Sequence, residues 1–147
     1  MSFFSHNPPW YAAGLAFQCA RCGRCCAGPE DGYVWANDAE IAAIAAHLGI
    51  SIEELHHQYL RRARGRCTIV MQPDNKDCPF LSPAGNGPRT CAIYPVRPMQ
   101  CRTWPFWPVN MRCVDDWMRA GMRCPGINRG ATLSCDEIKA KLNAVQV

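Results

Sequence analysis

The sequence lacks an apolar run long enough to cross a membrane as a helix, which takes about 18 to 20 residues. It also lacks a secretory signal, because residues 1–17 carry no basic start and Gly14 interrupts their longest apolar run. We therefore expect no membrane association and a reducing, cytoplasmic location. Internal repeats and long low-complexity tracts are absent as well, which excludes repeat architectures.

No pattern in the sequence is typical of a catalytic centre. The carboxylates are scattered, no nucleophile stands out beside a base, and there is no glycine-rich cofactor loop. The C-x3-C-x2-C triad of radical enzymes that use S-adenosylmethionine is not found in this sequence. Whether the chain is an enzyme is uncertain from the sequence.

The charge balance does not predict a nucleic-acid partner. Lysine and arginine number 16 against 12 acidic residues, a formal charge of +4 that counts every cysteine as neutral. One local basic run stands out, and it is formed by Arg61, Arg62, Arg64 and Arg66. We interpret it as the solvated end of a helix rather than as a phosphate-binding surface.

Long regular elements are also scarce, because the 147 residues include twelve prolines and eleven glycines. That length predicts one domain, residues 1–147, with a hydrophobic core that is thin for its size. We expect an α+β fold that is small, irregular and loop-rich, with a helical hairpin, a C-terminal helix and a few short strands.

Capping patterns locate the expected helices. The first begins at Asn37 and ends at Gly49, the second begins at Ser51 and ends before Gly65, and the last begins at Ser134. Residues 32–36 and 67–71 are prone to form strands, and residues 91–94 follow a turn cluster at 82–89 across which they are expected to pair.

What the chain does have is eleven cysteines, four of them within eight residues. Cys19, Cys22, Cys25 and Cys26 form a C-x2-C-x2-C-C run, a spacing that lets thiolates converge on a metal. A disulfide between the adjacent pair is disfavoured, since their Cα atoms are about 3.8 Å apart and disulfides prefer about 4.4 to 6.8 Å. Neighbouring side chains of an extended segment point to opposite faces, so Cys25 and Cys26 could serve two different centres.

A disulfide framework is the alternative reading of so many cysteines. The odd number of cysteines, the vicinal pair and the absence of a secretory signal all favour metal ligation instead.

Four further cysteines are spread through the second half, and they are Cys78, Cys91, Cys101 and Cys124. Cys78 and Cys124 each precede a proline, an arrangement also found after a ligating cysteine of bacterial ferredoxins. These four are candidate partners of the N-terminal run.

With these motifs, the chain resembles the YkgJ-like cysteine-cluster proteins, described as zinc- or iron-chelating domains. The resemblance covers about residues 17–126 and includes Cys91-x-Ile93-Tyr94-x2-Arg97-Pro98-x2-Cys101-Arg102 and Cys124-Pro125-Gly126. It implies eight metal ligands, which are Cys19, Cys22, Cys25, Cys26, Cys78, Cys91, Cys101 and Cys124. Cys67, Cys113 and Cys135 lie outside the pattern, and we expect them to be buried small side chains.

Eight thiolates suit two four-iron clusters or two tetrahedral zinc ions. We favour iron–sulfur centres of the 4Fe-4S type, because only the first half offers a C-x2-C knuckle of the kind that zinc sites pair. The corresponding function is electron transfer to an unknown protein partner. A zinc-binding interaction or metal-delivery module is the alternative, and a metalloenzyme with an open coordination position is the third possibility.

Two arginines flank the expected ligand Cys101, and they are candidates for binding or tuning the cofactor. Arg97 and Arg102 could donate hydrogen bonds to thiolate or cluster sulfur, or could simply bond backbone carbonyls of the proline-rich loop. Trp104, Phe106 and Trp107 could shield a cluster from water, although core packing is the simpler expectation.

Overall fold

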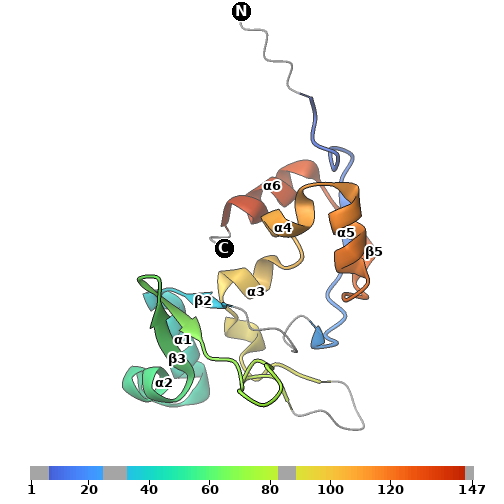
Figure 1. Cartoon of the computed structure of the whole chain (residues 1–147). Helices are drawn as coiled ribbons and strands as arrows, with labels where there is room; N and C mark the ends of the chain where they lie inside the picture. The colour runs from blue at the N-terminus through green and yellow to red at the C-terminus, as the bar shows by residue number, and fades with distance from the viewer. Residues whose placement is uncertain (1–6, 25–32, 83–88, 145–147) are drawn as a thin grey trace, which may run out of the picture.

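The computed structural model describes residues 7–24, 33–82 and 89–144. Figure 1 shows two groups of elements with helix α3 between them. In chain order the elements are β1 (Leu15–Phe17), β2 (Trp35–Ala36), α1 (Asp38–Leu48), α2 (Ile52–Tyr59), β3 (Leu60–Ala63), β4 (Arg66–Ile69), the 3-10 helix η2 (Tyr94–Val96), α3 (Met99–Thr103), α4 (Pro108–Met111), α5 (Val114–Gly121), β5 (Ile127–Leu133) and α6 (Cys135–Ala144). The expected small α+β fold is confirmed.

The first group consists of helices α1 and α2 and a three-stranded antiparallel sheet of order β2-β4-β3. Helix α1 begins with the predicted capping box, in which Asn37 and Glu40 each bond the other's backbone amide. It ends at Gly49, whose φ of 70° is the left-handed conformation that favours glycine. Ser51 caps α2 as predicted, by accepting from the amide of Glu54.

The basic run departs from our prediction, because it lies on a β-hairpin and not at a helix end. Helix α2 ends at Tyr59, and strands β3 and β4 pair across Arg64 and Gly65. Both turn residues have positive φ, 52° and 74°, as a tight two-residue hairpin requires. The arginines also have aromatic partners here, since Arg61 and Arg64 lie over the ring of Tyr33. These non-local contacts outweigh the helical pattern of the local sequence.

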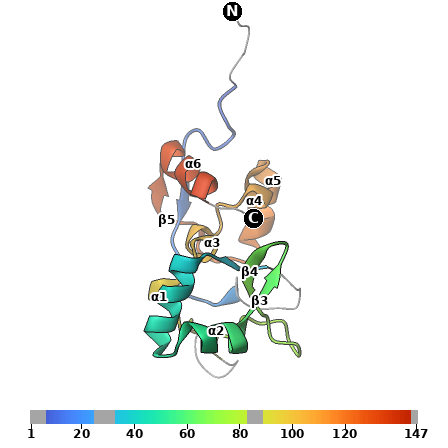
Figure 2. The ribbon, with the colours of Figure 1, turned by 90° about the vertical axis from the view of Figure 1, so that its left-hand side faces the viewer.

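The second group contains α4, α5, α6 and a two-stranded antiparallel sheet of β1 and β5. In Figure 2 this group lies at one end of the molecule and the helical hairpin lies at the other. Leu15 pairs with Leu133, and Phe17 pairs with Ile127 after an irregularity in the register. Helix α6 begins with the predicted reciprocal bonds between Ser134 and Glu137.

Each group has its own hydrophobic core. The α1–α2 core contains buried Ile41, Ile44, Leu55, Ile69, Cys78, Phe80, Leu81 and Ile93. The α5–α6 core contains Phe106, Met111, Trp117, Ala120, Cys124, Ile127 and Ile138. Fully burying one such large side chain stabilises a fold by about 1.5 to 3 kcal/mol, so both cores are needed to hold short elements together.

The segment between residues 78 and 103 links the two cores. Leu81 and Cys91 form an isolated antiparallel bridge, which is the pairing expected across the 82–89 turn. Helix α3 is tied to the first sheet by Gln100, which accepts from the amide of Trp35 at 3.1 Å and donates to the carbonyl of Tyr33. Helix α3 also contacts α6 of the second group.

No helix in the described ranges is both long and apolar enough to span a membrane.

Candidate metal centre

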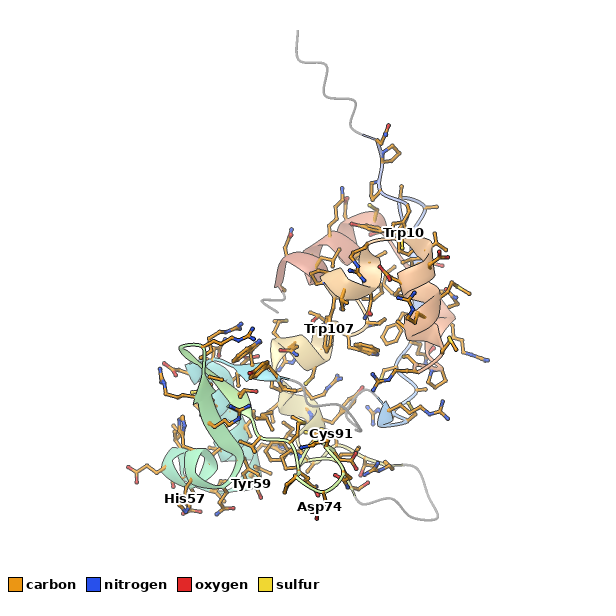
Figure 3. The ribbon with its side chains drawn as sticks, in the orientation of Figure 1. Trp10, His57, Tyr59, Asp74, Cys91 and Trp107 are labelled. Carbon is orange, nitrogen blue, oxygen red and sulfur yellow. The ribbon has the colours of Figure 1, made fainter. Side chains whose placement is uncertain are left out.

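Four of the predicted cysteine ligands line one cavity of about 120 Å³, and they are Cys19, Cys22, Cys91 and Cys124. The cavity lies at the junction of the two groups, because Cys91 packs against the α1–α2 core and Cys124 belongs to the α5–α6 core. Figure 3 labels Cys91 in this region. The four cysteines differ in their exposure to solvent: Cys124 is buried, Cys22 and Cys91 are half-buried, and Cys19 is exposed.

Strands β1 and β5 bring Cys19 close to Cys124. Directly after β1, the amide of Gln18 donates to the carbonyl of Gly126 at 3.1 Å. A Cβ atom on Gly126 would be 2.0 Å from the carbonyl oxygen of Gln18, so only glycine permits this approach. The cysteines adjoin this contact, one residue after Gln18 and two residues before Gly126.

The loop that carries Cys22 turns tightly around it. Arg21 and Gly23 on either side both have positive φ, 53° and 76°. Gly23 also approaches the 81–91 bridge, because a Cβ there would be 2.8 Å from Leu81 Cδ1 and 3.1 Å from Arg89 Cβ. The loop that carries Cys22 therefore packs directly against the segment that carries Cys91.

Cys91 is held by hydrogen bonds across the 82–89 turn. The amide of Ser82 donates to the carbonyl of Thr90 at 2.8 Å, and the amide of Thr90 donates to Oγ of Ser82 at 2.8 Å. The amide of Ala92 donates to the carbonyl of Phe80 at 2.8 Å. Cys91 is therefore held between two hydrogen-bonded segments of the chain. The expected strand pairing across the turn is limited to the single bridge between Leu81 and Cys91.

Three arginines, Arg21, Arg89 and Arg97, lie on the cavity wall. Arg89 pairs with the buried carboxylate of Asp77 at 2.7 Å and donates from Nε to the carbonyl of Ser82. The guanidinium groups of Arg21 and Arg97 lie over the ring of Tyr94, 4.1 and 3.8 Å from its centroid. Arg21 and Arg97 would place positive charge beside thiolates in this cavity, whereas the charge of Arg89 is already paired with Asp77.

Of the predicted ligands in the described ranges, Cys78 and Cys101 do not line this cavity. Cys78 is buried in the α1–α2 core and Cys101 is half-buried in α3, while Cys25 and Cys26 lie outside the described residues. Of the two candidate arginines, only Arg97 lines the cysteine cavity. Arg102 lines a separate hollow of about 700 Å³ beside the start of α1 and the β3–β4 hairpin.

The cysteines outside the family pattern do not meet at the cavity. Cys67 is buried in β4, as expected, but Cys113 is exposed just before α5 and Cys135 is half-buried at the start of α6. The expectation that all three are buried is therefore wrong for Cys113 and Cys135, because both lie at the starts of helices and keep part of their surface exposed.

The chemistry of the four donors fits zinc or iron, since both metals bind cysteine thiolates. Within the described ranges, no three cysteine, histidine or carboxylate side chains are close enough to hold one ion as they stand. Ligation therefore requires the thiols to approach one another across the cavity. None of the four lies in a helix: Cys19, Cys22 and Cys124 belong to loops, which allows such an adjustment, and Cys91 lies in the bridge with Leu81.

Sequence reasoning missed several residues of the wall. Arg21 and Arg89 carried no recognisable motif, and only folding brings Arg89 beside Gly23. Of the three aromatic residues considered as a shield, Trp104 lines the cavity, whereas Phe106 is fully buried in the α5–α6 core and Trp107 bonds the carbonyl of Gln100.

Comparison with known proteins places the chain among cysteine-cluster proteins. It is 32% identical over 96 residues to the protein named "Uncharacterized protein MJ0661" from Methanocaldococcus jannaschii, an alignment that covers 65% of this chain and 48% of that protein. The chain thus spans about half the length of this curated relative. No solved structure matches it.

The family model CxxCxxCC, described as "Putative zinc- or iron-chelating domain", matches residues 18–141. The match includes all eight predicted ligands and every element from β2 to β5. The chain therefore belongs to the CxxCxxCC family of zinc- or iron-chelating domains.

Proposed function

We propose that this protein carries iron–sulfur centres ligated by cysteine and transfers electrons to a protein partner. The observation that supports the proposal best is the convergence of Cys19, Cys22, Cys91 and Cys124 on one cavity from three separate parts of the chain. Four thiolates are the usual protein ligand set of a 2Fe-2S or 4Fe-4S cluster.

The iron–sulfur assignment rests on the spacing of the ligands and on their surroundings. Cys22 follows Cys19 in a short turn, as in cluster-binding runs, while Cys91 and Cys124 come from distant segments. Phe17, Leu81 and Trp104 form apolar parts of the wall. Such walls exclude water and thereby tune a reduction potential. The exposed position of Cys19 leaves one edge of the site near the surface, where a partner could exchange electrons.

A second centre would use the remaining four ligands. Cys78 and Cys101 lie off the cavity wall, and Cys25 and Cys26 lie outside the described residues. Four wall cysteines suffice for one centre, which leaves both vicinal cysteines for the other. This allocation differs from the split of Cys25 and Cys26 between two centres. Single C25S and C26S variants distinguish them: under our allocation both lose the same centre, and under the split each loses a different one.

The candidate arginines have different positions relative to this centre. The Nε of Arg97 donates to the carbonyl of Tyr94 at 3.0 Å, and its guanidinium lies on the Tyr94 ring at the cavity wall. We assign Arg97 a role in balancing the charge of the thiolates. Arg102 lies on the other hollow, so any effect on the cysteine cavity must act through α3.

Zinc is the second candidate, since four thiolates also form a closed tetrahedral zinc site. The cysteine cavity lies between two separate hydrophobic cores, so a zinc ion bound there would cross-link them and stabilise the fold. In this case the protein would be an interaction or metal-delivery module.

Anaerobic purification followed by iron, zinc and sulfide analysis tests these alternatives. Iron with an equal amount of sulfide, and a visible absorption that dithionite bleaches, would support the electron-transfer proposal. A colourless protein that holds zinc without iron or sulfide would contradict it and select the zinc module.

A further inference from the structure

The hydrogen bonds of the tryptophan indoles single out one side chain. Three of the five indoles donate to protein acceptors. Nε1 of Trp10 donates to the carbonyl of Met111 at 2.8 Å. Nε1 of Trp107 donates to the carbonyl of Gln100 at 2.9 Å, and Nε1 of Trp117 donates to Oδ1 of Asn128 at 3.1 Å.

Trp104 is different. Its Nε1 is buried, and it is the one buried side-chain nitrogen or oxygen without a hydrogen-bond partner in the described part of the chain. An unsatisfied buried donor costs about 1 to 3 kcal/mol. Such a group calls for an explanation, and an ion or water at a functional site is one of the usual ones.

The position of Trp104 supplies that explanation. Trp104 lines the cavity together with Cys19, Cys22, Cys91 and Cys124. Its ring is held edge-on against Trp107, with centroids 4.9 Å apart and planes at 80°. Trp107 is in turn fixed by its bond to Gln100. The donor without an acceptor thus belongs to a positioned ring on the wall of a sulfur-rich site.

We propose that the indole N–H of Trp104 donates a hydrogen bond to a sulfur atom of the metal centre in this cavity. The inference rests on the proposed metal site. Metal-bound thiolate and cluster sulfide carry negative charge and accept such bonds, whereas a neutral thiol is a weak acceptor. The bond withdraws negative charge from sulfur, so it stabilises the bound metal and raises the reduction potential of a cluster. Trp104 is therefore a positioning and tuning residue and not a metal ligand.

A zinc titration of the ¹⁵N-labelled protein, followed through its indole N–H signals, tests this directly. Zinc is the probe because it is diamagnetic and binds four thiolates. The W104F variant assigns the signal by its loss. We expect zinc to move the Trp104 indole proton downfield and to slow its exchange with water, while the Trp117 indole, which already donates to Asn128, stays unchanged.

The affinity for zinc, measured by competition with a chelator, provides the second readout. We expect W104F to weaken zinc binding by roughly tenfold, the usual effect of removing a group that bonds a metal ligand. W10F is the control, since it removes an indole that does not line the cavity and whose N–H is bonded to the carbonyl of Met111. It should change the affinity by less than about twofold.

Each remaining outcome overturns the proposal. If zinc binds but the Trp104 signal is unchanged, the indole does not bond sulfur. If the signal is equally protected before zinc is added, a water molecule or carbonyl is the acceptor. If the wild-type protein binds no zinc and no iron, the metal site itself is wrong and the inference fails with it. The wild-type titration remains decisive even if W104F does not fold.

Discussion

The backbone amide of Gln18 donates to the carbonyl of Gly126 at 3.1 Å, and this contact joins two segments more than a hundred residues apart in the chain. One of them continues into Cys19 and the other follows Cys124. The geometry of the proposed centre therefore depends on a close approach of two backbones, which the lack of a side chain at Gly126 makes possible.

We predict that Gly126→Ala destabilises the protein by about 2 kcal/mol or more and weakens metal binding. The added Cβ would be 2.0 Å from the Gln18 carbonyl oxygen, so the backbone must move apart. Thermal unfolding and chelator competition measure the two effects. Gly121→Ala is the control, because its Cβ would meet only the side chain of Ile127 at 3.3 Å. Equal stability and affinity in both variants would refute the role of this contact.

Serine substitutions at the cavity should remove one centre. We predict that Cys22→Ser and Cys124→Ser each lower the metal content by about half, since each removes a thiolate from one of the two proposed centres. Cys113→Ser and Cys135→Ser, outside the family pattern, should keep the wild-type content. Elemental analysis of the folded, purified variants gives the answer. If Cys135→Ser lost as much metal as Cys22→Ser, our ligand set would be wrong.

The ion pair of Arg89 and Asp77 should stabilise the cavity wall. Arg89→Met leaves the Asp77 carboxylate, whose side chain is only 8% exposed, without this charged partner. It also removes the bond to the Ser82 carbonyl. We predict a loss of about 2 kcal/mol in the free energy of unfolding, measured in urea. Arg129→Met, at an exposed position of β5, should have almost no effect. A similar loss in both variants would show that the pair contributes nothing specific.

The stability of α5 should depend on pH through Asp116. Its carboxylate accepts hydrogen bonds from Arg112 at 2.8 Å and from Arg119 at 3.0 Å. The hydrogen bond from Arg112 and the positive charge of that guanidinium hold the pKa of Asp116 below the ordinary range of an aspartate. Partial burial of the carboxylate opposes this shift but does not cancel it. Because the folded pKa is lower than the unfolded one, the stabilisation is present at neutral pH. It disappears as the pH falls below the ordinary range of an aspartate and through the lower folded pKa.

The measurement is the difference in unfolding free energy between wild type and Asp116→Asn at a series of pH values. The subtraction cancels the acid sensitivity of the metal centres, which both proteins share. We expect the difference to be constant from about pH 7 to 5 and to shrink in stronger acid. A difference that grows on acidification would contradict the assignment.

Local capping chemistry explains which parts of the fold could be predicted. Asn37 with Glu40, Ser51 with Glu54, and Ser134 with Glu137 mark helix starts through side chains three residues apart, and the structure confirms all three. The turn before Cys91 was similarly marked by its glycine, asparagine and proline content.

Long-range pairing explains what could not be predicted. Strand β1 is only three residues long, and its pairing with β5 depends on a partner at the other end of the chain. The hairpin of β3 and β4 replaces a helical pattern because Arg61 and Arg64 contact Tyr33, almost thirty residues earlier. Helix α5 was missed for a similar reason: its buried side chains, Trp117 and Ala120, pack on elements that are distant in sequence.

The candidate site shows the same limit. Cysteine spacing and the family resemblance supplied eight candidate ligands, but neither could indicate which four share a cavity. That grouping follows from the Gln18–Gly126 contact, the close approach of Gly23 to Leu81, and the Leu81–Cys91 bridge. Each of these joins segments that only the folded chain brings together.

Anomalous diffraction from crystals of the metal-loaded protein tests the central claim most directly. We predict a zinc or iron peak in the cavity between the two cores, bonded to the Sγ atoms of Cys19, Cys22, Cys91 and Cys124 at about 2.3 Å. A metal peak elsewhere, ligated by Cys67, Cys113 or Cys135 and with none at the four wall cysteines, would contradict the account.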